Sequence, residues 1–285
     1  QVITVPSTTT FTITQSSNAS GSASGGSLTV KAFERVGPAE QSYGYGWGLE
    51  TWGTGGFGSA ASASNITLEP GLWSLDNFGE VLIATIANGK TFTWNSGAAS
   101  AFTTRASTST TNFSTSANPT STRLTLISPT TRHLIHLGTE TTIGTSSTRD
   151  NMFIRFSDAE NINSYDTSAT NTAGSQRLQD GTKIIGALKA KETILIWTDN
   201  ALYTMKFVGA PFTFGFEQVG TNCGLIGKNA AVEIDGVAYW MSPNGFFLFD
   251  GTVKTLPCTV EDHVFDNINR NKGQQVTAGL NNLFT

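Results

Sequence analysis

Side chains that could carry acid–base or metal chemistry are few in this sequence. Its histidines are His133, His136 and His263. His133 and His136 stand three residues apart in the apparent strand Arg132–Gly138, where an odd spacing places side chains on opposite faces. We therefore do not expect them to share a metal ion. The chain also contains neither HExxH nor GxSxG.

Neighbouring carboxylates are the second possible source of catalysis, because a pair of acids can hydrolyse a glycosidic bond. The nearest pairs are Asp158 with Glu160 and Glu261 with Asp262. Nothing in the sequence places either pair in a cleft, and no phosphate loop of the form GxxxxGK(S/T) is present. We predict no catalytic residue, no cofactor and no metal site, and expect that the protein is not an enzyme.

The two cysteines, Cys223 and Cys258, are too few for a disulfide scaffold, and their spacing fits no zinc ligand set. Two buried, reduced thiols are favoured, and a single disulfide bridge between them is the alternative.

The composition favours short strands and tight turns. The 285 residues are 38% hydrophobic, enough for a sizeable core, but only 13% charged, against about 25% in an average globular protein. A net charge of −4 argues against an electrostatic grip on nucleic acid. No apolar run approaches the roughly 20 residues of a membrane span. The chain begins at Gln1 without a signal-peptide pattern, so we expect a fragment or a processed chain.

The clearest structural signal is Val232–Gly251, VEIDGVAYWMSPNGFFLFDG. Short apolar and aromatic runs, separated by Asp-Gly and Asn-Gly, predict an antiparallel meander of three strands. We expect this stretch to be the most regular and most protected part of the fold.

Similar runs recur between residues 72 and 208. The expected strands are Val81–Ile86, Thr91–Trp94, Leu124–Ile127, Arg132–Gly138, Met152–Phe156, Lys183–Leu188, Thr193–Trp197 and Ala201–Val208. Asp76–Gly79 is expected to be a turn in which Asp76 or Asn77 caps its own backbone. Val260–Ile268 is expected to be a short helix capped by Thr259.

The repeat of these runs predicts an architecture. Strands that end each run carry an aromatic residue at Trp94, Phe156, Phe207 and Phe249, at intervals comparable with propeller blades of about 40–50 residues plus insertions. We predict an all-β, β-propeller-like fold, whole or incomplete. A sandwich is the second prediction, because spacing does not distinguish radial from stacked sheets.

Three regions are expected along the chain. Residues 1–40 form a small separate β-hairpin unit, since residues 2–14 alternate around Pro6-Ser7. Residues 41–62 form a Gly/aromatic linker with Trp47 and Trp52, which is either an inter-subunit clasp or a linker packed on its own domain. Residues 63–285 form the propeller-like domain, which is expected to continue beyond the chain end.

Ordered motifs across residues 43–269 resemble one protein family. They are TWGTGGFGS (51–59), LWSLDNFGEVLIATIANGKTFTWN (72–95), RFSDAENINSYDTSATNTAGSQRL (155–178), LIWTDNALYTMKFVGAPFTFGFEQVGTNCGLIGKNAAVEIDGVAYWMSPNGFFLFDG (195–251) and LPCTVEDHVFDNIN (256–269). Together they are similar to tail tubular protein B, or nozzle, of short-tailed bacteriophages, and to the related head-completion proteins that retain packaged DNA. Stretch Ser74–Gly79 is also faintly similar to the Asp box of sialidase propellers, but it has one residue too many before the glycine.

The resemblance implies a structural virion protein in a ring of six copies below the portal and tail adaptor. Its channel would retain and conduct viral DNA without specific binding, and tail fibre or needle proteins would be further partners, with no membrane involved. The family has no catalytic residues. The residues that fall in the matching motifs are therefore expected to be structural: Trp47, Trp52, Trp73, Asp76, Asn77, Gly79, Asn222, Cys223, Gly224 and Pro257.

Two other functions stay open. A carbohydrate-binding or glycan-hydrolysing propeller of a tail spike would need an aromatic-lined cleft with convergent acids. A host-side adhesion protein built from β repeats is the third reading.

Overall fold

The computed structural model describes residues 2–7, 10–13, 72–98, 101, 106–107 and 117–281, and the chain divides into two units, 1–36 and 37–285. In the first unit, β1 (Val2–Ser7) and β2 (Thr10–Ile13) pair as an antiparallel hairpin. Pro6 and Ser7, around which the alternation was expected to turn, belong to strand β1, and Ser7 pairs with Thr10. Segment 41–62, with Trp47 and Trp52, lies outside the described residues.

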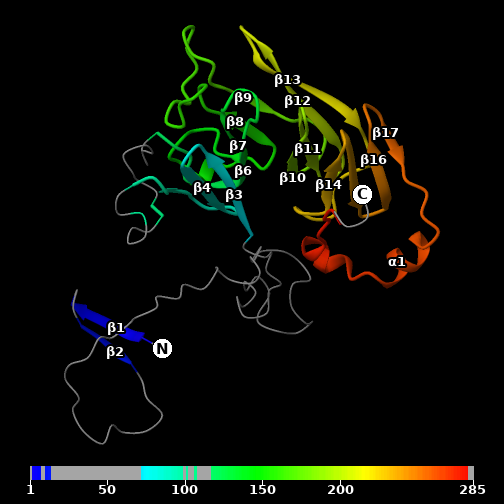
Figure 1. Ribbon diagram of the computed structural model, residues 1–285, viewed down its shortest axis with the longest axis horizontal. Coiled ribbons are helices and arrows are strands. Elements are labelled where there is room, and N and C mark those ends of the chain that lie inside the picture. Colours follow the sequence, from blue (N-terminus) through cyan, green and yellow to red (C-terminus); the bar gives the residue numbers. More distant parts are fainter. Residues whose placement is uncertain are drawn as a thin grey trace, which may run out of the picture. The chain divides into compact units, whose positions relative to one another are not determined.

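Four antiparallel sheets make up the described part of the second unit, and each is built from strands that are consecutive in the chain (Figure 1). The first sheet holds β3 (Trp73–Phe78), β4 (Val81–Ile86) and β5 (Thr91–Asn95). The second holds β6 (Thr122–Ile127), β7 (Leu134–Thr139), β8 (Phe153–Phe156) and β9 (Gly174–Arg177). The third holds β10 (Ile184–Lys189), β11 (Ile194–Thr198), β12 (Leu202–Gly209) and β13 (Thr213–Gly220). The fourth holds β14 (Ala231–Ile234), β15 (Val237–Ser242), β16 (Gly245–Phe249) and β17 (Val253–Thr255).

The predicted meander is confirmed in the fourth sheet. Asp235 and Gly236 both have positive φ, at 52° and 86°, which is the backbone that a tight two-residue hairpin turn requires. β14, β15 and β16 follow in register, and β17 adds a fourth strand beyond them.

The sheets pack face to face in chain order, like adjacent blades of a propeller. Ile83 of β4 and Leu134 of β7 belong to a core between the first and second sheets. A larger core that includes Ile154 joins the second and third sheets, and one that includes Trp197 and Trp240 joins the third and fourth. No core of the described residues joins the first sheet to the fourth. The all-β, propeller-like prediction is therefore correct, and the arrangement is an open fan and not a two-sheet sandwich.

The first strands of the sheets lie closest to the centre of the fan. β6 contacts β3 and β10, and β10 contacts β14 (Figure 1). Every residue of β6, β7 and β11 is buried, whereas β14 and most of β16 are half-buried. Burial is thus greatest in the middle sheets, and our expectation that Val232–Gly251 is the most protected stretch is wrong as far as burial shows it.

Two local predictions also need correction. Residues 76–78 belong to strand β3, so the turn lies at Gly79 and Glu80. Phe156, Phe207 and Phe249 lie on the third strand of a four-stranded sheet and not on the last. In the first sheet a single bridge from Thr93 to Ser107 stands where a fourth strand would pair.

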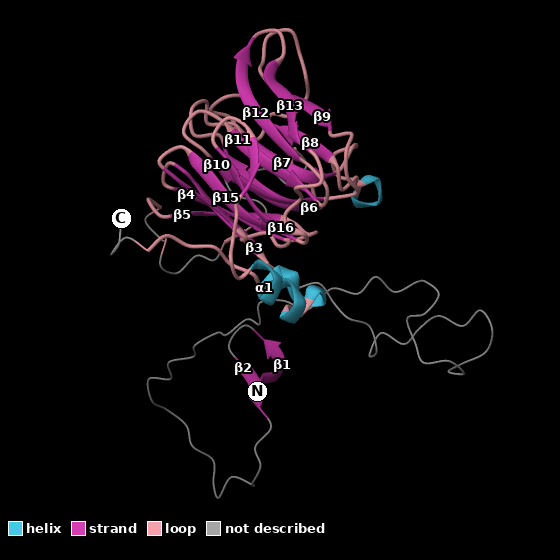
Figure 2. Cartoon of the chain, turned by 90° about the vertical axis from the view of Figure 1, so that its right-hand side faces the viewer, coloured by secondary structure: helices cyan, strands magenta, loops and turns pink. Residues whose placement is uncertain are grey.

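Short helices complete the unit. α1 (Glu261–Asn267) is confirmed, but Val260 holds the N-cap position and no side chain caps it, so the predicted Thr259 cap is wrong. Two 3₁₀ segments are η2 (Ser146–Thr148) and η3 (Arg270–Gln275). Among the described residues, no helix has the length and apolar character needed to cross a bilayer. Figure 2 shows that the β12–β13 hairpin extends beyond the neighbouring strands.

Candidate functional site

Asp76 makes polar contacts between neighbouring sheets at the centre of the fan, and we call such a contact a joint. Its carboxylate accepts the backbone N–H of Ile127 in β6 at 2.6 Å, and Lys189 Nζ at the end of β10 lies 2.5 and 2.7 Å from its two oxygens. It also accepts the N–H of Asn77 at 2.8 Å. One side chain of the first sheet therefore binds the innermost strands of the second and third. A carboxylate so fully occupied by donors is suited to holding strands together rather than to proton transfer.

Lys228 makes a second joint, from the connection between β13 and β14. Its Nζ donates to the carbonyl oxygen of Trp73 at 2.7 Å and to Ser74 Oγ at 2.8 Å. Burial, with a smaller contribution from the nearby Arg123 guanidinium, lowers the pKa of Lys228 to about 8. The first sheet is thus bound to the connection between the third and fourth sheets by a cation that is largely buried.

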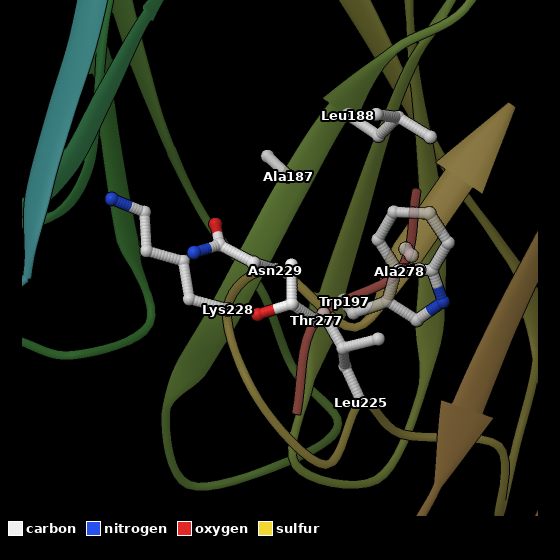
Figure 3. A pocket seen from close by; sticks show the side chains of 9 residues that line it. Ala187, Leu188, Trp197, Leu225, Lys228, Asn229, Thr277 and Ala278 are labelled. Atoms are coloured by element: carbon white, nitrogen blue, oxygen red, sulfur yellow. The ribbon is translucent and has the colours of Figure 1, made fainter. Parts of the chain in front are cut away.

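A pocket of about 280 Å³ lies beside this lysine, between the third and fourth sheets. Its apolar wall is formed by Leu188, Trp197 and Leu225, and its polar groups come from Lys228, Asn229 and Thr277. Figure 3 shows that the Lys228 amine extends away from Trp197, towards β3. The amine is engaged there, so the pocket offers mainly apolar surface.

The motif residues Asn222, Cys223 and Gly224 form the connection from the third sheet to the fourth. The Cys223 N–H donates to the carbonyl of Asn200 at 3.0 Å, and the Cys223 carbonyl accepts Trp240 Nε1 at 2.8 Å. A Cβ added at Gly224 would lie 2.2 Å from the carbonyl oxygen of Asp199. The sequence needs glycine here because the chain passes directly against the β11–β12 turn.

The remaining described motif residues lie apart from one another. Trp73 and Asn77 are exposed on β3, Gly79 has φ +63° in the β3–β4 turn, and Pro257 is exposed before α1. The thiols of Cys223 and Cys258 are both unbridged; Cys223 is buried and Cys258 half-buried. The structure therefore brings together Asp76 and the strands around it, but does not gather the motif residues into one site.

His133 lies in a chain of hydroxyl groups that has the form of a catalytic relay. Thr172 Oγ1 donates to Asp158 at 2.6 Å, His133 Nε2 lies 3.0 Å from Thr172 Oγ1, and His133 Nδ1 lies 2.7 Å from Thr131 Oγ1. Hydrogen bonds from Thr172, more than any other contact, lower the pKa of Asp158, while burial lowers that of His133.

The surroundings of this relay are those of a structural element. His133 is 0% exposed and packs edge-on against Phe214, with ring centroids 5.0 Å apart, and near Phe156. No substrate could reach the imidazole without unpacking these rings. The relay instead fixes the loop that carries Thr172 to the turn before β7.

The His136 imidazole has a different set of hydrogen-bond partners. It is 0% exposed, its Nδ1 lies 3.1 Å from Thr122 Oγ1, and its Nε2 lies 2.9 Å from the Tyr165 hydroxyl. Burial, helped by the Arg155 charge, lowers the pKa of His136 to about 3, so the imidazole is neutral at physiological pH. As the odd spacing implied, the two histidines do not converge.

The acid pairs considered from the sequence do not converge either. Asp158 is used by Thr172, whereas Glu160 pairs with Arg132 at 2.9 Å on the surface. Glu261 and Asp262 lie in the first turn of α1. Sequence reasoning missed another pair, Glu192 and Glu233, which line a pocket of about 210 Å³ together with Phe249. No sequence signal could reveal that pair, because only the packing of the third and fourth sheets brings the two acids together.

The fold defines a β-propeller-like protein in which Asp76 and the Asn222–Gly224 connection contact neighbouring sheets. A scan of protein-family models and a search of curated proteins found no match. Among solved structures, BamB from Moraxella catarrhalis is similar, with 18% identity over 66% of this chain and 50% of that one, at a TM-score of 0.37.

A second similar structure is AztD from Citrobacter koseri, with 10% identity over 70% of this chain and 49% of that one, at a TM-score of 0.37. A third is the extracellular domain of a putative hybrid two component system, BT4673, from B. thetaiotaomicron, with 12% identity over 70% of this chain and 24% of that one, at 0.40. The matched region spans half or less of each of these chains. Likenesses this distant carry no argument about function.

Proposed function

We propose that the protein is a structural component of a short phage tail, a nozzle or tail-tube protein whose copies assemble around a channel for the viral genome. The observation that supports this most is the place of the shared motif residues. Asp76 and the Asn222–Gly224 connection hold sheets together and leave no open acid, base or nucleophile at those positions. A role in building a scaffold fits such residues better than a role in turnover.

The distribution of charge is also compatible with a conduit. A wall that lets DNA pass should make few cation–phosphate contacts, because each neutralised phosphate strengthens the complex. The chain is weakly acidic, and two of its cations, Lys189 and Lys228, are engaged by protein oxygens. The tail adaptor and fibre or needle proteins are the proposed partners, and the virion is the proposed location.

The test combines the assembly state of the purified chain with its affinity for DNA. Native mass spectrometry and negative-stain images should show a ring of several copies with an open centre. A labelled DNA duplex should bind weakly at 50 mM salt and lose that binding at 200 mM. A chain that stays monomeric, or one that holds duplex DNA tightly at 200 mM salt, would contradict the proposal.

A glycan-binding or glycan-cleaving propeller is the second candidate, and the pocket with Glu192, Glu233 and Phe249 is where it would act. A glycan array probed with the wild-type chain and with Glu192→Gln and Glu233→Gln variants decides between the two. Binding or cleavage that both substitutions abolish would favour this candidate over the tail protein.

A further inference from the structure

The two end sheets of the fan each leave one face without another sheet packed on it, within the described residues. In the first sheet, Ser74, Ile83 and Thr85 point to the second sheet and are buried. The strand register places the alternate residues on the opposite face. We call this the first-sheet free face, and its apolar residues are Trp73, Leu75, Leu82, Ile86, Phe92 and Trp94.

The first-sheet free face is apolar and accessible. Leu75 is 65% exposed and Trp73 is 37% exposed, although both lie within a strand. Trp73 and Phe92 pack together, with ring centroids 5.8 Å apart, and the six residues include no charged side chain. Exposed apolar surface of this kind on a sheet face marks a contact site.

The fourth sheet has a matching face. Its Trp240–Phe247 row packs towards the third sheet, so the neighbouring row of Val232, Tyr239 and Leu248 points the other way. With Ile234 and Val237, these residues form the apolar part of the last-sheet free face, and all five are half-buried. The exposed Lys254, which pairs with Leu248, lies on the same face. α1 covers one end of it, where Phe265 and Phe246 have ring centroids 5.4 Å apart.

The repeat itself makes these two faces complementary. Each internal contact in the fan joins one face of a sheet to the opposite face of the next sheet in the chain. The last-sheet free face is the kind of face that receives a following sheet, and the first-sheet free face is the kind that receives a preceding one. A second copy of this chain carries both, and packing them together continues the established inter-sheet contact.

We infer that the first-sheet free face of one copy packs on the last-sheet free face of another, as the contact that joins neighbouring subunits. This rests on the proposed assembly into rings and names the surfaces that form it. The contact is heterologous, since it joins two different patches, and repeated head-to-tail contacts close into a ring when the rotation per copy allows it.

The experiment uses two single substitutions and their mixture. Leu75→Lys places a charge on the first-sheet free face, and Leu248→Lys places a second positive charge beside Lys254 on the last-sheet free face. Each variant alone should dissociate to monomers, with self-association weakened about 30-fold or more in sedimentation velocity. Mixed in equal amounts, they should associate again, because one variant keeps an intact last-sheet face and the other an intact first-sheet face.

Two controls keep the result interpretable. Val208→Lys changes an exposed residue on β12, away from both faces, and should leave association unchanged. Circular dichroism spectra should show that all three variants keep their strands. Leu75 is largely exposed, so its replacement does not disturb the core.

Three results would overturn the inference. A weak contact should still form at a protein concentration of about 100 μM. If the wild-type chain is monomeric at that concentration, both this contact and the proposed ring are contradicted. If both variants still assemble, the proposed contact is wrong, and a ring would have to form through other surfaces. Variants that dissociate but fail to associate when mixed would show that these two faces do not bind each other.

Discussion

At the residue scale, several buried polar side chains among the described residues pair with threonine hydroxyls. Thr85 bridges Thr91 and Thr125 with two hydrogen bonds of 2.8 Å, and this joins the first sheet to the second inside the core. A threonine satisfies its hydroxyl this way without the cost of burying a charge. Threonine hydroxyls thus satisfy one another in the interior between these two sheets.

His136 provides the prediction at this scale. Its folded pKa, about 3, lies below the ordinary 6.5, so the unfolded chain takes up a proton below pH 6.5 while the native protein does not. Stability should therefore fall as pH drops through 6.5, and from pH 7 to pH 5 this residue should cost about 2 kcal/mol.

Urea unfolding at the two pH values measures this loss. In His136→Gln, which cannot titrate, the pH dependence should shrink, and the buried His133 should contribute what remains in the same direction. His263→Gln, on the exposed surface of α1, is the matched control. An unchanged pH dependence in His136→Gln would show that His136 is not neutral and buried as described.

At the element scale, the joints between strands matter more than the strands themselves. The third strands β8, β12 and β16 were expected from their apolar and aromatic runs, whereas the edge strands β9, β13 and β17 were missed. Edge strands have solvent on most sides, as the burial of β9 and β17 shows, so their residues need not alternate. The predicted Asp76 turn failed for a related reason. Its polar residues suit a turn, but within β3 they are used by partners from β6 and β10.

Asp76→Ala tests the central joint. The substitution leaves the Ile127 N–H and Lys189 without their acceptor in a site where the Asp76 side chain is only 14% exposed. We expect a loss of about 2–3 kcal/mol in the free energy of unfolding. Asp76→Asn should lose less, because its amide oxygen can still accept the N–H.

The matched control is Asp250→Ala, which removes a partner of Lys254 in a surface ion pair four residues apart. Exposed pairs of this kind contribute little, so its urea midpoint should stay close to that of the wild type. Equal losses at Asp76 and Asp250 would show that the central joint is no stronger than a surface contact.

At the scale of the whole molecule, each sheet is expected to be stabilised mainly by the sheets packed next to it. Each middle sheet packs on two others, whereas the first and fourth pack on one each within the described residues. In such quasi-one-dimensional arrays, end units are held by fewer neighbour contacts and open first.

Hydrogen exchange measures this directly. In the Leu75→Lys variant, where association should not contribute, amides of β3–β5 and β14–β16 should exchange before those of β6, β7 and β11. Wild-type chain at high concentration should protect β3 and β16 more than the variant does. Uniform exchange across the four sheets would show that the fan unfolds as one cooperative unit.

The sequence by itself determined the class of fold and much of its local structure. Period-two alternation and turn pairs such as Asp235-Gly236 are local signals, so they predicted the hairpins, the meander and a propeller-like repeat. The absence of known catalytic motifs was also visible without a structure.

Only the tertiary structure decided which residues meet. Asp76 lies 113 positions from Lys189, and Glu192 and Glu233 line the same pocket only because two sheets pack together. Among the described residues, radial packing and not stacking leaves one face of each end sheet without another sheet packed on it. Local pattern cannot specify these features, because they depend on how one sheet face is buried against the next.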